Sequence, residues 1–89
     1  MAYNPYGYKN IATATTTVVK SGVGILHSIV VNTTAAGAIT VYDNTAGSGT
    51  KIATLKASVV EGSYIFDVAF ATGLTIITAA ASDITVTYT

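Results

Sequence analysis

The segment VYDNTAGSGTKI, residues 41–52, has the residue types of a loop that could bind a cation or a phosphate. An EF-hand calcium loop needs oxygen ligands at alternate positions and a glutamate at the twelfth. Counted from Asp43, the fifth position is Gly47 and the twelfth is Thr54, and neither residue supplies the required carboxylate. The segment therefore lacks the negative charge that a tight calcium site requires.

The order of residues in the same segment also excludes a phosphate-binding loop. In such a loop the last glycine precedes a lysine, which is followed by serine or threonine. Here Gly49 is followed by Thr50 and then by Lys51. We instead predict a hairpin turn, in which Asp43 and Asn44 bond to their own backbone and one of the two glycines adopts a positive φ.

His27 is the only histidine, and the sequence contains no cysteine. A zinc site needs three or four ligands, so only a symmetric oligomer that brought three copies of His27 to an axis could form one. The alternation of residues predicts that His27 shares a face with Ile25, Ile29 and Val31. We favour a histidine whose hydrogen bonds are satisfied on a packed strand, and we predict no metal site.

The four acidic residues do not form a pair suited to acid–base catalysis. Asp43, Glu61 and Asp83 fall at predicted turns, and Asp67 lies within a predicted strand. Alternation places Asp67 on the face opposite the phenylalanine and valine that flank it, and so toward solvent. No serine has the sequence context of a nucleophile elbow. We therefore expect a protein that is not an enzyme and that uses no cofactor.

Regularly spaced glycines and small polar residues divide the chain into short runs rich in Val, Ile, Thr, Tyr and Phe, which favour β-strands. The predicted strands are 11–20, 24–33, 38–43, 50–57, 63–70, 74–79 and 83–89. These seven strands predict an all-β fold: a single antiparallel β-sandwich over residues 11–89, with either immunoglobulin-like or jelly-roll-like connections.

Two of these strands show a regular alternation of apolar and polar residues, which is typical of one buried face. Their predicted inward side chains are Tyr64, Phe66, Val68 and Phe70 in one strand and Ile84, Val86 and Tyr88 in the other. Residues 25–31 are apolar on both faces, which predicts a central strand or one covered by a neighbouring subunit. Gly73, in ATGLTI, is predicted to take a left-handed conformation in a short hairpin.

Residues 1–10 differ from the rest and are predicted to form an extended N-terminal arm. The arm contains Tyr3, Tyr6 and Tyr8, and Pro5 and Gly7 oppose regular structure within it. Tyrosine is enriched at protein interfaces. We predict an interaction surface formed by the three arm tyrosines together with Ile25, His27 and Ile29.

The composition predicts a subunit of a larger assembly. Only 9% of the 89 residues are charged, against about 25% in typical soluble domains. Such a chain is poorly protected against association, and we expect a homo-oligomer, with three chains as the best estimate. Four lysines balance four acids and arginine is absent, which argues against nucleic-acid binding. No apolar run is long enough to span a membrane, and the N-terminus lacks the features of a signal peptide.

Residues 20–89 resemble a group of small phage structural proteins. The resemblance is carried by GILHSIVVN, ITVYDNT, FATGL and DITVTY. The matching residues are Leu26, His27, Ile29, Asn32, Tyr42, Asp43, Asn44, Thr72, Gly73, Leu74, Asp83, Thr85 and Tyr88. The resemblance implies a virion component made in the host cytoplasm, and specifically a decoration or cement protein that binds the major capsid protein on the capsid exterior. The alternatives are a tail or head-fibre accessory protein and a module that binds host-surface glycans.

Overall fold

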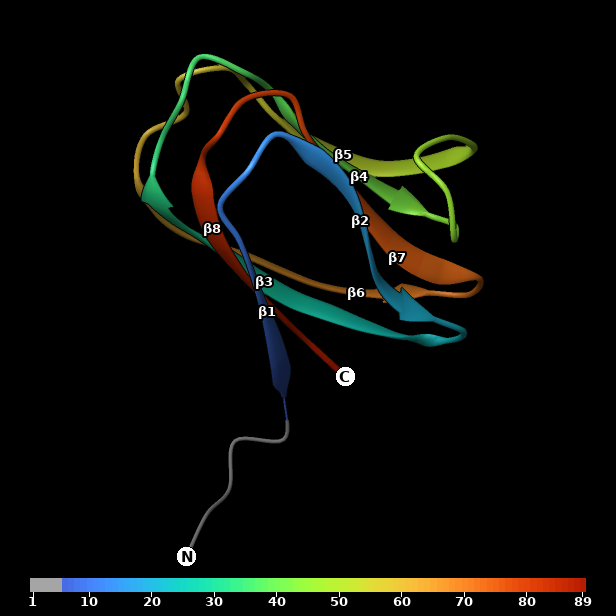
Figure 1. Ribbon diagram of the computed structural model, residues 1–89. Helices are drawn as coiled ribbons and strands as arrows, with labels where there is room; N and C mark the ends of the chain where they lie inside the picture. Colours follow the sequence, from blue (N-terminus) through green and yellow to red (C-terminus); the bar gives the residue numbers. More distant parts are fainter. Residues whose placement is uncertain (1–5) are drawn as a thin grey trace, which may run out of the picture.

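The structure, a computed structural model, describes residues 6–89, which form eight β-strands (Figure 1). The strands are β1 (Gly7–Ile11), β2 (Thr15–Ser21), β3 (Gly24–Thr33), β4 (Ile39–Asp43), β5 (Thr50–Leu55), β6 (Gly62–Phe70), β7 (Gly73–Thr78) and β8 (Asp83–Tyr88). Within residues 6–89 no helix is long and apolar enough to cross a membrane.

The strands form two antiparallel four-stranded sheets that pack as a sandwich. Sheet A has the order β1-β8-β3-β6, and sheet B has the order β2-β7-β4-β5. This arrangement confirms the predicted all-β sandwich. It also distinguishes between the two kinds of connection that the sequence left open. An immunoglobulin sandwich pairs its first two strands with each other, whereas here β1 pairs with the last strand, β8. The order is that of an eight-stranded jelly roll.

Alternating side chains from both sheets fill the space between them. The fully buried large side chains include Leu26 and Ile29 from β3, Ile76 from β7, and Ile84 from β8. The predicted inward face of β6 is confirmed, but only Phe70 is fully buried, while Phe66 is partly buried against the core. Phe70 is therefore the principal aromatic residue of the core.

β3 is central in sheet A, between β8 and β6, as its two apolar faces predicted. Its pairing with β8 shifts between Leu26 and Ser28, so that His27 is an extra residue in a β-bulge. Because of this bulge Leu26 and Ile29 both point inward although they are three residues apart. His27 therefore lies on the outer side of the sheet with Ile25, as predicted, but the prediction that it shares this face with Ile29 and Val31 is wrong, because both of these side chains are buried.

The boundary predicted between the arm and the sandwich is also wrong. Gly7–Asn10 belong to β1, and the register pairs Gly7 with Tyr88 and Ile11 with Ile84. Four of the five residues of β1 are exposed and only Ile11 is buried, so the strand lacks the apolar alternation by which a strand is recognised. Backbone hydrogen bonds to β8, more than side-chain burial, incorporate this segment.

Candidate functional site

The loop between β4 and β5 is the hairpin that the sequence predicts (Figure 1). Asn44 stabilises it locally, since its Nδ2 donates to Ser48 O at 2.7 Å and its Oδ1 accepts from Thr45 N at 2.8 Å. Gly49 has a φ of 95°, as a turn of this kind requires. This loop thus has a structural role that accounts for its residue types.

Asp43 does not bond within its own loop, contrary to prediction. Its carboxylate accepts hydrogen bonds from the backbone N–H groups of Ala71, Thr72 and Gly73 in the turn between β6 and β7. The bonds from Ala71 and then Thr72 hold the pKa of Asp43 below its ordinary value. Asp43 therefore joins two turns at one end of the sandwich.

Gly73 occupies that same junction, but it does not adopt the predicted left-handed conformation. A Cβ atom at Gly73 would lie 2.8 Å from Thr45 Cγ2 and 2.9 Å from Lys20 O. Glycine is needed here because neighbouring chain segments approach its backbone closely.

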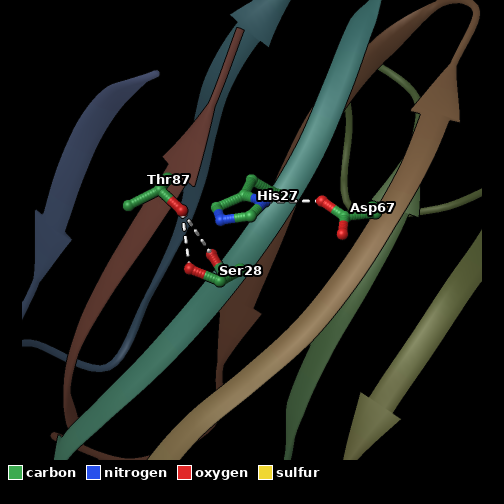
Figure 2. A network of polar contacts seen from close by, with 4 residues as sticks. All are labelled: His27, Ser28, Asp67 and Thr87. Carbon is green, nitrogen blue, oxygen red and sulfur yellow. Dashed lines mark hydrogen bonds and ion pairs between the residues drawn. The ribbon is translucent and has the colours of Figure 1, made fainter. Parts of the chain in front are cut away.

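A hydrogen bond joins His27 and Asp67 on the outer side of sheet A (Figure 2). The Nδ1 atom of His27 lies 2.5 Å from Oδ1 of Asp67. Asp67 projects from a bulge in β6, where its φ is 51°. The predicted outward position of Asp67 is confirmed.

The ring of Tyr6 covers His27. The two ring centroids are 4.1 Å apart and the ring planes differ by 6°. Stacking of this kind adds contact energy beyond simple burial. The His27–Asp67 pair therefore positions the residue that immediately precedes β1.

An aspartate–histidine pair beside a hydroxyl suggests a catalytic triad, but the hydroxyls here have other partners. Ser28 follows His27 in the chain, and its Oγ lies 2.6 Å from Thr87 Oγ1 in a hydrogen bond between the two strands (Figure 2). Thr87 Oγ1 is also within 3.5 Å of Ser28 O. The Ser28–Thr87 pair bridges β3 and β8, and Ser28 is buried.

A second polar network fixes β1 to the sheet. Asn10 Nδ2 donates to Asp83 Oδ1 at 2.7 Å and to Ile84 O at 2.9 Å. From the other side of β8, Asn32 Nδ2 donates to Thr85 Oγ1 at 3.2 Å. Three strands are thus cross-linked by side chains that satisfy one another.

Apolar side chains stand among these polar networks. The register places Tyr8, Thr87, Ser28 and Ile65 in one row across all four strands of sheet A. Tyr8 at one end is 74% exposed and Ile65 at the other end is 61% exposed. We refer to the outer surface of sheet A defined by Tyr8, Ile25, His27, Ser28, Ile65 and Thr87 as the A face.

The A face brings together most of the predicted interaction residues. Tyr6, Tyr8, Ile25 and His27 lie on it or beside it, whereas Tyr3 is outside the described residues. Ile29 is wrongly predicted, because it is fully buried in the core. Sequence reasoning also missed Ile65, although the alternation in its strand places it opposite the inward aromatic residues.

Within residues 6–89 the structure contains no pocket and no group of three or more His, Cys, Asp or Glu residues suited to a metal ion. Comparisons with protein-family models, with curated proteins and with solved structures gave no match. The A face is therefore the surface of the described residues whose chemistry bears on function.

Proposed function

We propose that this chain is a structural protein of a bacteriophage virion: a decoration protein, not an enzyme, that forms homo-oligomers of three chains. It binds the major capsid protein on the exterior of the capsid. One observation carries the proposal. The A face exposes apolar side chains, while its polar side chains are already hydrogen-bonded to one another.

Such a face is suited to burial against another protein. Removing a polar group from water is unfavourable unless the group keeps a hydrogen bond. Ser28, Thr87, His27 and Asp67 keep theirs within the face, so a partner need only cover the exposed Tyr8 and Ile65. A glycan-binding surface would instead need free hydrogen-bond donors and acceptors for sugar hydroxyls. On the A face many of the polar side chains are hydrogen-bonded to one another.

The jelly roll supports the proposal only by analogy. Jelly rolls form viral capsid domains, but they also form lectins and cupins, so the fold by itself does not separate these functions. The resemblance of residues 20–89 to small phage structural proteins favours the first of these. The low content of charged residues favours a protein that works within an assembly.

We assign contact with the capsid to the N-terminal segment. Its anchor is Tyr6, which is stacked on His27 of the A face. The segment that precedes this anchor includes Tyr3, and an aromatic side chain supplies much contact area at an interface.

Deletion of residues 2–5 tests this assignment, since it leaves Tyr6 and β1 intact. Particles prepared without this protein should bind many copies of the parent protein, counted by mass spectrometry, and few copies of the deletion variant. The particle test requires that the variant melt at the temperature of the parent. Deletion of residues 2–9 is unsuitable, because it would remove most of β1.

Several results would contradict the proposal. A few copies per virion would indicate a tail or head-fibre position. Unchanged binding of the deletion variant would place the capsid contact on the sandwich. Saturable binding on a glycan array, without binding to particles, would favour recognition of a host surface.

A further inference from the structure

We propose that copies of this chain associate front to back, with the A face of one copy against sheet B of the next. This inference rests on the homo-oligomer of the proposed function, and it does not depend on binding to the capsid. It specifies which surfaces meet and excludes a contact between two A faces.

The two sheets carry opposite charge although the chain as a whole is neutral. Sheet A and the residue just before β6 carry one lysine and three acids, a net side-chain charge of −2: Lys9, Glu61, Asp67 and Asp83. Sheet B and the residue just after β5 carry three lysines and one acid, a net charge of +2: Lys20, Asp43, Lys51 and Lys56. The chain is therefore neutral as a whole, but its two sheets differ in the sign of their net charge.

This polarity decides how two copies meet. Like charges placed opposite each other across an interface oppose association, whereas complementary charges favour it. Two A faces in contact would set one acidic sheet against another. An A face placed on sheet B would instead set Asp67 and Asp83 near a surface that carries Lys51.

A stable interface between copies also needs exposed apolar side chains and sufficient surface area. Tyr8 and Ile65 stand out on the A face, and Val18 on β2 of sheet B is 49% exposed. The molecule measures 36 × 34 × 17 Å, and the thin dimension matches a stack of two sheets. A broad side of this size can supply the ~800 Å² per partner that a standard protein interface buries.

A front-to-back contact differs from a contact between identical patches in the assemblies that it can form. A contact between identical patches closes a dimer, whereas a contact between different patches forms a ring when its rotation closes. Two copies joined in this way leave one A face and one sheet B surface free, so a third copy can add to either end.

Two substitutions test the two sides, and each has a matched control. Ile65→Lys places a charge on the A face, and Lys51→Glu reverses a charge on sheet B. Val60→Lys is the control for the first, because Val60 is 73% exposed and lies in the loop before β6, outside both sheets. Lys9→Glu is the control for the second, because it changes net charge equally but lies on sheet A.

Analytical ultracentrifugation over a range of concentrations should show an oligomer for the parent protein. Self-association should be at least tenfold weaker in each test variant, while both controls should assemble at least as tightly as the parent. Association of the parent should also weaken as salt is raised, because exposed charges are screened. Circular dichroism and melting temperature establish that each variant is folded.

Mixing the two test variants provides the sharpest measurement. Ile65→Lys retains an intact sheet B, and Lys51→Glu retains an intact A face. An equimolar mixture should therefore form dimers and no larger species, although each variant alone is monomeric. Full assembly of Lys51→Glu by itself, or no association in the mixture, would overturn the front-to-back contact.

The outcome for this contact can be separated from the outcome for the proposed function. A parent protein that is monomeric but still binds capsids would reject this inference and leave the decoration role standing. A parent protein that assembles front to back but does not bind capsids would reject the decoration role alone.

Discussion

Asp43 on β4 holds the turn between β6 and β7, because its Oδ1 accepts a hydrogen bond from the backbone N–H of Thr72 at 2.8 Å. The same carboxylate accepts further bonds from Ala71 and Gly73. It connects a turn of sheet B with the segment that leaves sheet A, and so joins both layers at one end of the molecule.

Asp43→Asn should lower the melting temperature at neutral pH, and the difference from the parent should shrink in acid. The backbone hydrogen bonds lower the pKa of Asp43 below its ordinary value of 3.8. A lowered pKa gives stability that is present above the ordinary value and is lost as the pH falls through the lowered one. Thermal melts of both proteins across this pH range measure the effect.

Glu61→Gln is the control for that experiment, because it removes the same charge. Glu61 accepts one backbone hydrogen bond, from Thr34 N at 3.0 Å, whereas Asp43 accepts three. We expect a smaller change for Glu61→Gln at neutral pH. Equal effects of the two substitutions would show that net charge matters, and not the junction of the turns.

Phe70→Ala should destabilise the fold by about 3–5 kcal/mol, the usual result of removing a buried aromatic ring. Phe70 is 1% exposed and lies at the end of β6. Ile65→Ala, in the same strand, should change the free energy of unfolding by only about 0.5 kcal/mol, because Ile65 faces outward. Urea denaturation measures both values. A small loss for Phe70→Ala would contradict the described core.

Gly73→Ala should destabilise the protein by about 1–3 kcal/mol, since the added methyl group overpacks a tight junction. It would meet Thr45 Cγ2 and Lys20 O at less than 3 Å. Gly7→Ala is the control, because the nearest atom to its added Cβ lies at an ordinary 3.7 Å. If the two variants melted at the same temperature, the close approach at Gly73 would be refuted.

Asn10→Ala should loosen β1 more than the rest of the sandwich. The substitution removes the hydrogen bonds to Asp83 Oδ1 and Ile84 O, each worth about 0.5–1.5 kcal/mol net. Hydrogen exchange should become faster at the amides of Gly7–Ile11 and change little at those of β3. Uniform acceleration across both strands would instead indicate that β1 opens only when the whole domain unfolds.

The sequence alone predicts those features that arise from neighbouring residues. The alternation of Ile84, Val86 and Tyr88 identifies β8 and its inward face, because successive side chains of a strand point to opposite sides. The residues of the 44–49 loop identify a hairpin, because their side chains bond locally and Gly49 accepts a positive φ. The sandwich as a class follows from several such strands.

Only the tertiary structure decides the features that depend on residues far apart in the chain. β1 is a strand because β8 offers it backbone partners, and Asn10 bonds to Asp83, 73 positions away. The bulge at His27 arises in its pairing with β8, and it turns His27 outward to Asp67 and Tyr6. No local sequence pattern predicts these pairings, because the contacts that stabilise them form only when both sheets have formed.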